Sequence, residues 1–231
     1  MDQDNASTRN REQARRMRSR IQRSSDRFWR PSDFSTPEST TLHILSALNR
    51  SGDLRRVRKG LYWRGTSTPL GMSPPPPTAL LNELIGPSGV GPSGLSAANL
   101  LHLSTQVPRK GHFSVPCRPP KDLPMLELTG RSGQTLRRDV KLTAREVALL
   151  EVLGDPSSSE LSAAQYWQVL RDEIRSDRVR PDRLARASKT ENAPTRARLS
   201  SLLDSAGFTD LARAIPPVDR RVRQRALVGA A

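Results

Sequence analysis

The sequence predicts an α+β fold in two parts, a small N-terminal domain and a larger mixed α/β C-terminal domain that ends in helices. Helix-like and strand-like segments alternate in the first 64 residues, and four consecutive prolines at 74–77 indicate a stiff, extended linker. The second part continues with helices, short strand-like segments and several helical patterns. At 231 residues the chain is long enough for two such domains.

The first helix is predicted over residues 9–22, after a disordered tail at residues 1–8. The stretch RNREQARRMRSRIQ favours a helix and is mostly polar, with a single apolar stripe. That stripe consists of Ala14, Met17 and Ile21. A short strand at Phe28-Trp29 and one helical turn over residues 31–34 are predicted to follow.

A second helix is predicted to end at Gly52 and to bury one leucine-rich face. At its start, either Ser35 and Glu38 form a capping box, or Thr36 caps the helix with Pro37 at the first helical position. The buried face is expected to carry Leu42, Leu45 and Leu48.

A basic β-hairpin comes next, because apolar and basic residues alternate from Leu54 to Trp63 around the turn residues Lys59-Gly60. Helix, strand, helical turn, helix and hairpin is the element order of a winged helix-turn-helix. The sequence therefore predicts a winged helix over residues 9–64, followed by a proline-rich linker over residues 65–78.

The C-terminal α+β domain is predicted over residues 79–217, with a basic disordered tail at residues 218–231. Helices are expected at TALLNELIG and LSAANLLHL, and three strands at HFSVPC, MLELTG and TLRRDVKL. Thr143 and Glu146 form a capping box that opens a helix ending at Gly154. Further helical patterns cover residues 162–175, 181–187, 195–206 and 209–215.

Positive charge is concentrated in the N-terminal domain. The chain has a net charge of +15, and residues 1–64 hold 15 basic and 7 acidic side chains, a net of +8. Such an excess on a small domain indicates a polyanionic partner, and double-stranded DNA fits the predicted winged helix. A solvated basic surface with no partner remains the alternative.

The chain is expected to be a cytoplasmic protein without a membrane span. It has one cysteine, Cys117, which excludes an internal disulfide framework, and it has no run of about 18 apolar residues. The first ten residues lack the apolar stretch of a secretory signal.

Candidate DNA-binding side chains lie at the start of the second helix, on its outward face and on the hairpin. Small or hydrogen-bonding side chains suit the major groove, while basic side chains on a wing suit phosphates or the minor groove. Hydroxyls at helix starts suit phosphates as well. The candidates are Ser32, Thr36, Ser39, Thr40, His43, Ser46, Arg50, Arg55, Arg56, Arg58, Lys59 and Arg64.

Other motifs point to a catalytic or cofactor site less strongly. The glycines within residues 89–94 match the dinucleotide-binding string, but a helix-like segment precedes them, which favours a structural turn. Glu127, Asp139 and Lys141 resemble the two carboxylates and lysine of a metal-dependent nuclease. The three histidines and Cys117 have no metal-ligand spacing. We therefore expect no cofactor, no metal site and no enzymatic activity.

Two blocks of sequence resemble a known family. Residues 28–63, which end in ILSALNRSGDLRRVRKGLYW, resemble the winged-helix domain of the AbiEi-type antitoxins, and PSGLSAANLLHLSTQVP at residues 92–108 resembles the start of the second domain in AbiEi-like proteins. In the second block His102 stands where glycine is more common, so a left-handed backbone is expected there. The first block rests on Phe28, Pro31, Asp33, Phe34, Leu45, Leu48, Gly52, Leu54, Arg56, Gly60, Leu61 and Tyr62.

The resemblance implies the antitoxin and autorepressor of a type IV toxin–antitoxin pair. Such a protein binds its own promoter, here expected as a homodimer, and opposes a nucleotidyltransferase-like toxin. Three other functions stay open on the sequence alone: a stand-alone winged-helix regulator, a metal-dependent nuclease that uses Glu127, Asp139 and Lys141, and an interaction protein that neutralises a partner through residues 79–217.

Overall fold

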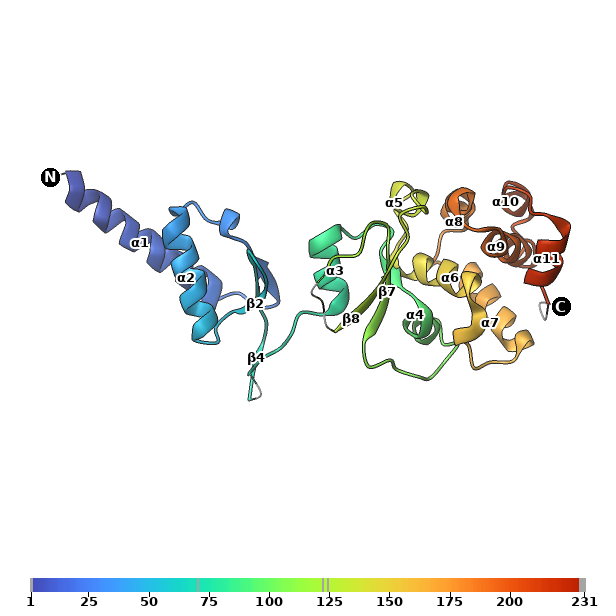
Figure 1. The fold of residues 1–231 in the computed structure, drawn as a ribbon, viewed down its shortest axis with the longest axis horizontal. Helices are drawn as coiled ribbons and strands as arrows, with labels where there is room; N and C mark the ends of the chain where they lie inside the picture. Colours follow the sequence, from blue (N-terminus) through green and yellow to red (C-terminus); the bar gives the residue numbers. More distant parts are fainter. Residues whose placement is uncertain (1, 70, 122, 124, 229–231) are drawn as a thin grey trace. The chain divides into compact units, whose positions relative to one another are not determined.

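The structure, a computed structural model, describes residues 2–69, 71–121, 123 and 125–228, with side chains described from residue 11 onward. The chain folds as two units, residues 1–80 (unit 1) and residues 81–231 (unit 2), which are described separately below (Figure 1). Helices and small sheets occur in both units, so the predicted α+β class is confirmed.

Unit 1 has the element order of a winged helix-turn-helix. Its three strands form an antiparallel sheet in the order β1-β3-β2, with Phe28 paired to Trp63 and Arg56 paired to Tyr62. The elements are α1 (Asp2–Gln22), β1 (Arg27–Trp29), the 3₁₀ helix η1 (Pro31–Asp33), α2 (Glu38–Arg50), β2 (Arg55–Arg58) and β3 (Leu61–Arg64).

Helix α1 begins earlier than the sequence analysis predicted. The helix starts at Asp2 rather than near Arg9, so residues 2–8 are helical and not a disordered tail, while residue 1 lies outside the described residues. These residues contain neither glycine nor proline, and acidic side chains at positions 2 and 4 favour a helix N-terminus.

A small apolar core joins α1, α2 and the sheet. Trp29 is fully buried, its ring stacks on Phe34 with centroids 5.1 Å apart, and its Nε1 donates a hydrogen bond to Ser24 Oγ at 3.1 Å. The core residues are Met17, Ile21, Trp29, Ile44, Leu45, Leu48, Leu54 and Tyr62. The predicted apolar stripe of the first helix therefore packs inward, with Ala14 half-buried beside it.

The buried face of α2 differs from the prediction at one position. Leu45 and Leu48 are buried as expected, but Leu42 is 42% exposed, and Thr41 and Ile44 are buried instead. With about 100° between successive residues, positions 41, 44, 45 and 48 form a tighter stripe than a face that includes residue 42.

The predicted caps of α2 are also wrong. Pro37 occupies the N-cap position, and no side chain caps the helix there. Thr36 instead donates its hydroxyl to the sulfur of Met17 at 3.7 Å, and its carbonyl accepts a hydrogen bond from the Thr41 hydroxyl. The Thr36 side chain, which the capping pattern assigned to the start of α2, therefore contacts α1 instead.

Part of the predicted linker is ordered structure of unit 1. Within residues 65–78, β4 (Ser67–Thr68) and β5 (Gly71–Met72) form a small antiparallel hairpin. The Nε1 of Trp63 donates a hydrogen bond to the Ser73 carbonyl at 2.9 Å, which fastens this hairpin to the end of β3. Residues 74–76 have no helix or strand assignment, and α3 (Pro77–Ile85) starts inside the proline run.

Unit 2 contains a three-stranded mixed sheet in the order β6-β7-β8. β6 (Gly91–Pro92) pairs antiparallel with β7 (Gly111–Val115), which pairs in parallel with β8 (Leu126–Gly130). Helix α4 (Gly94–Leu100) contacts β7, and helix α6 (Ala144–Gly154) contacts both β6 and α4.

The third predicted strand, TLRRDVKL, is wrong. These residues form the short helix α5 (Leu136–Asp139), in which Arg137 is buried. Its Nε and Nη2 donate to the carboxylate of Glu191 at 2.6 and 2.8 Å, and its Nη1 donates to Glu151 Oε1 and Ser114 Oγ. A strand would place Arg137 and Asp139 on one face, whereas the helical turn lets Arg137 alone point inward.

The remaining helices form the C-terminal part of unit 2, in which α9 contacts α7, α8, α10 and α11 (Figure 1). They are α7 (Ala163–Arg175), α8 (Pro181–Ala187), α9 (Ala193–Ser205), α10 (Thr209–Arg213) and α11 (Arg220–Ala226), with 3₁₀ helices η2 (Pro156–Ser158) and η3 (Ser188–Thr190). The predicted capping box of Thr143 and Glu146 at the start of α6 is confirmed.

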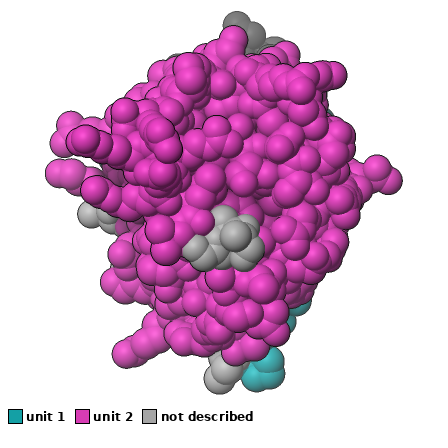
Figure 2. All heavy atoms as spheres, turned by 90° about the vertical axis from the view of Figure 1, so that its right-hand side faces the viewer, with its two compact units in different colours: residues 1–80 teal, residues 81–231 magenta. Residues whose placement is uncertain are grey.

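The predicted disordered tail at residues 218–231 is wrong where the structure describes it. Helix α11 falls in this range, and the Nε of Arg198 on α9 donates to the Ala226 carbonyl at 2.9 Å. Residues 229–231 lie outside the described residues. Figure 2 shows the surface of unit 2, in magenta, from the side on which the label of the C-terminus stands in Figure 1.

Candidate nucleic-acid interface

The outward face of α2 carries four of the predicted contact residues. Ser39, His43, Ser46 and Arg50 recur every three or four positions and are all exposed. Helical spacing puts them on one side of the helix, opposite the buried stripe. We call these four residues the outward face of α2. Thr40 is half-buried at its margin.

The hairpin that follows α2 forms a basic wing, defined here as β2, β3 and the turn Lys59-Gly60. Arg55, Arg56, Arg58 and Lys59 are all exposed, as the sequence analysis predicted. Gly60 has a φ of +74°, which a side chain would strain, so the turn is tight. Four positive charges thereby lie within five residues of one strand and its turn.

Helix and wing are joined by a side chain that the sequence analysis did not single out. The Oδ1 of Asn49 on α2 accepts a hydrogen bond from the backbone N–H of Arg56 at 2.8 Å. The ladder between β2 and β3 shifts its register between Arg56 and Arg58. Asn49 therefore holds β2 next to α2 at the point where the ladder of the wing is irregular.

Three other predicted residues lie outside the outward face of α2 and apart from the four exposed charges of the wing. Arg64 is on the central strand β3, in register with Arg27, and its Nη2 donates to the Gln22 carbonyl at the end of α1 at 3.5 Å. Thr36 is half-buried against Met17, and Ser32 is exposed on η1. Arg64 and Thr36 therefore make contacts within unit 1, and only Ser32 is as exposed as the outward face of α2.

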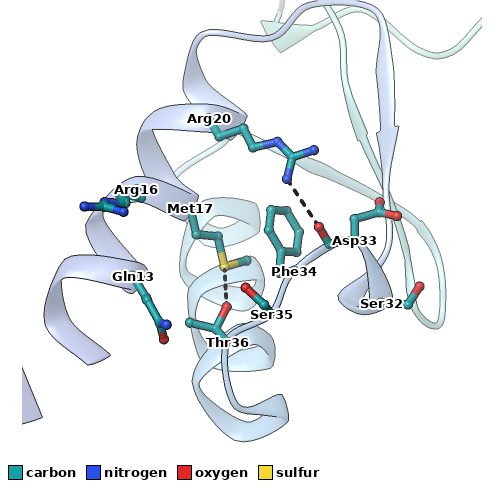
Figure 3. A pocket seen from close by; sticks show the side chains of 9 residues that line it. All are labelled: Gln13, Arg16, Met17, Arg20, Ser32, Asp33, Phe34, Ser35 and Thr36. Carbon is teal, nitrogen blue, oxygen red and sulfur yellow. Dashed lines mark hydrogen bonds between the residues drawn. The ribbon is translucent and has the colours of Figure 1, made fainter. Parts of the chain in front are cut away.

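A hollow of about 510 Å³ lies between α1 and the segment that leads into α2 (Figure 3). In Figure 3 the guanidinium of Arg20 points across to the Asp33 carbonyl, to which its Nη1 donates at 3.3 Å. The same guanidinium lies 5.1 Å from the ring centroid of Trp29. The hollow is lined by Gln13, Arg16, Met17, Arg20, Ser32, Asp33, Phe34, Ser35 and Thr36.

The arginines of α1 are contact candidates that the sequence analysis missed. Arg16 and Arg20 border the same hollow as Ser32, and both are exposed. Their spacing of four residues places them on one side of α1, beside the buried stripe of Met17 and Ile21. The four-residue spacing of Arg16 and Arg20, each one position before a residue of the apolar stripe, is the sequence signal that predicts that the two arginines share a face.

Of the residues in the nuclease hypothesis, only Glu127 lines the two hollows described here for unit 2. Glu127 on β8 lies 3.5 Å from His112 Nε2 and lines two hollows of unit 2. Asp139 and Lys141 line neither of them. Among the described residues, no group of three or more His, Cys, Asp or Glu side chains is placed to hold a metal ion.

The glycine string of residues 89–94 serves close packing. A Cβ on Gly91 would lie 2.5 Å from the Ala144 carbonyl oxygen, and one on Gly89 would lie 2.9 Å from the backbone of Arg137. The string thus brings β6 against α5 and α6. His102, at the end of α4, has the left-handed backbone that the family resemblance implied, with a φ of +58°.

No helix in the described part of the chain has both the length and the apolar character to cross a membrane.

The chain matches no family model and no curated protein. Its fold is similar to the crystal structure of the RV2827C protein from Mycobacterium tuberculosis, with a TM-score of 0.50 and 18% sequence identity. The match covers 90% of this chain and 83% of that chain, and at this identity it shows the fold alone.

Proposed function

We propose that this protein is a sequence-specific, double-stranded DNA-binding repressor that acts as the antitoxin of a toxin–antitoxin pair. The observation that carries the DNA-binding part is the combination of two surfaces in unit 1. The outward face of α2 presents Ser39, His43, Ser46 and Arg50, and the wing next to it presents four positive charges. The bond between Asn49 and Arg56 holds the two surfaces together.

The two surfaces match the two kinds of contact that a DNA-binding protein needs. An α-helix fits the major groove, where hydroxyl, imidazole and guanidinium groups form hydrogen bonds with base edges. Arginine and lysine on a hairpin neutralise phosphates and fix the orientation of the protein without reading the sequence. The outward face of α2 therefore supplies specificity, and the wing supplies most of the affinity.

The antitoxin part of the proposal rests on the resemblance of residues 28–63 and 92–108 to AbiEi-like proteins. Unit 2 supports a task beyond DNA binding because it has a large core of its own, to which α4 and the helices from α6 to α10 contribute. The proposed partner is a nucleotidyltransferase-like toxin encoded beside this protein, and the proposed binding site on DNA is the shared promoter.

DNA binding is tested with the full chain. Duplexes with a randomised core are selected for binding, and the selected duplex is compared with an unrelated one of equal length. The wild type should prefer the selected duplex, and His43→Ala should reduce that preference by about 1–3 kcal/mol, the value of one good base contact. His102→Ala, an exposed histidine of unit 2, is the matched control and should keep the preference. Equal binding of both duplexes by the wild type would refute sequence-specific recognition.

Antitoxicity is tested by growth of cells that express the neighbouring nucleotidyltransferase-like gene. The full chain, expressed from an unrelated promoter, should restore growth, and so should the variant in which Arg55, Arg56 and Arg58 are alanine. Glu127→Ala and Asp139→Ala should also restore growth. Loss of rescue in a folded carboxylate variant would favour the nuclease, and absence of rescue by the wild type would leave a stand-alone regulator.

A further inference from the structure

Leu42 is an apolar side chain in a polar setting. It is 42% exposed, and no other large hydrophobic side chain described in unit 1 is as exposed. Its neighbours one turn away on α2, Ser39 and Ser46, are exposed polar residues, and so is the adjacent His43. Leaving a leucine in water forgoes the free energy of its burial, which a bound partner would recover.

Leu42 lies close to both proposed DNA-binding surfaces, the outward face of α2 and the wing. At about 100° per residue, Leu42 projects within about 60° of Ser39 and Ser46 and within about 20° of Asn49. Asn49 is the residue bonded to the wing at Arg56. Leu42 therefore lies on the wing side of the outward face, in the N-terminal half of a helix whose range is Glu38–Arg50.

We propose that Leu42 is a specificity-determining residue that contacts the 5-methyl group of a thymine in the major groove. This inference rests on the proposed DNA-binding function. The major-groove edge of an A·T pair presents that methyl group, and apolar side chains recognise it. The serines and the histidine around Leu42 read hydrogen-bonding groups, so Leu42 supplies the apolar contact that they lack. The N-terminal residues of a recognition helix are those that reach base edges.

The test replaces thymine by deoxyuridine, which removes only the 5-methyl group. Each thymine of the selected duplex is replaced in turn, and binding of the full chain is measured. For the wild type, one or two replacements should weaken binding about fourfold, the value expected for one buried methyl group. For Leu42→Ala the same replacements should have no effect, because the side chain that contacts the methyl group is gone.

Controls separate this inference from the function on which it rests. Val107→Ala removes an exposed apolar side chain of unit 2 and should keep the wild-type response to deoxyuridine. If the wild type binds the selected duplex and no deoxyuridine replacement matters, or if Leu42→Ala responds as the wild type does, the thymine contact is refuted while DNA binding stands. If no duplex is selected at all, both proposals fail.

A second measurement tests a different use of Leu42. The oligomeric state of the free wild type and of Leu42→Ala is measured by sedimentation, and the two should be identical. A dimer that dissociates in the variant would overturn the proposal, because Leu42 would then be covered by a second copy of the chain and not by a base. Since Leu42 is outside the core cluster of unit 1, the variant should keep the wild-type thermal stability.

Discussion

The side-chain oxygen of Asn49 and the backbone N–H of Arg56 form a 2.8 Å hydrogen bond that links α2 to the wing. The Asn49 oxygen accepts from the N–H of Arg56, which lies on β2 at the point where the register between β2 and β3 shifts. Asn49 is half-buried, so water replaces its oxygen only in part when the side chain is removed. The Asn49 side chain is therefore one of the contacts that hold the wing next to α2, beside the packing of Leu54 and Tyr62 in the shared core.

Replacing Asn49 with alanine should destabilise the protein by about 1 kcal/mol and weaken DNA binding, because the wing loses one of the contacts that hold it next to α2. Urea unfolding and binding to the selected duplex measure the two effects. Asn99→Ala, which removes a longer 3.4 Å bond in unit 2, is the control and should leave DNA binding unchanged. Unchanged binding by Asn49→Ala would show that the link does not position the wing.

Removing the charges of the wing should lower the salt dependence of DNA binding. Each phosphate contact contributes about 0.9 to the slope of log K against log salt concentration, so alanine at Arg55, Arg56 and Arg58 should reduce the slope by about 2.7. Binding to all sequences should weaken about equally. The matched control removes three exposed arginines of α11, Arg220, Arg221 and Arg223, and should leave the slope unchanged. An equal reduction of the slope in both triple variants would mean that the total positive charge of the protein, and not the wing, determines the salt dependence.

Substitution by alanine should destabilise the protein at Gly91 and have little effect on its stability at Gly133. A methyl group at Gly91 would overlap the Ala144 carbonyl at 2.5 Å and the Val147 side chain at 2.7 Å, whereas at Gly133 it would meet no described atom within 4 Å. Gly91→Ala should therefore lower the free energy of unfolding by about 1–3 kcal/mol or more, and Gly133→Ala should change it by less than about 0.5 kcal/mol. Similar stabilities of the two variants would contradict the close packing of β6 on α6.

Arg137 should be among the residues that unit 2 tolerates least well as alanine. Its removal leaves the carboxylate of Glu191, whose side chain is 1% exposed, without its main partner, and deprives Glu151 of one of two arginines. Loss of one partner of a buried ion pair costs about 3–5 kcal/mol. Arg138→Ala, at the exposed neighbouring position of the same turn, is the control. Chemical unfolding of both variants makes the comparison, and equal stabilities would refute a structural role for the buried pair.

Acid should destabilise unit 2 through Glu146 and Glu151. Burial by itself raises the pKa of each carboxyl, but hydrogen bonds and charges of Arg180, and of Arg131 and Arg137, outweigh it and hold both pKa values below the usual 4.5. A carboxyl with a lowered pKa in the folded state stabilises the fold above its unfolded pKa and loses this effect as the pH falls through the folded value. Stability should thus be constant near neutral pH and fall below about pH 4.5.

The variant Glu146→Gln checks the origin of this acid sensitivity. It should be less stable than the wild type at neutral pH, because the amide nitrogen faces the donors of Arg180. It should also lose less stability than the wild type between about pH 6 and about pH 3, since one of the two titrating groups is gone. Parallel pH profiles for the two proteins would assign the acid sensitivity to other groups.

Local sequence patterns were sufficient for much of the fold. The hairpin around Lys59-Gly60 and the capping box of Thr143 and Glu146 each depend on residues a few positions apart, and both are present in the structure. The outward face of α2 was also predictable, because helical periodicity alone places Ser39, His43 and Ser46 together.

Tertiary contacts decided the features that local patterns missed. Residues 135–142 were predicted as a strand, yet Arg137 needs carboxylates that are 14 and 54 positions away along the chain, and the helix α5 brings it to both. Thr36 has the pattern of a helix cap, but the sulfur of Met17, 19 positions earlier, takes its hydroxyl. Leu42 fits a leucine stripe in the sequence, and only the tertiary structure, in which Thr41 and Ile44 are buried, leaves it exposed. Hydrogen bonds and burial between distant segments contribute more free energy than the weak local preference of a short segment, so the folded context determines such residues.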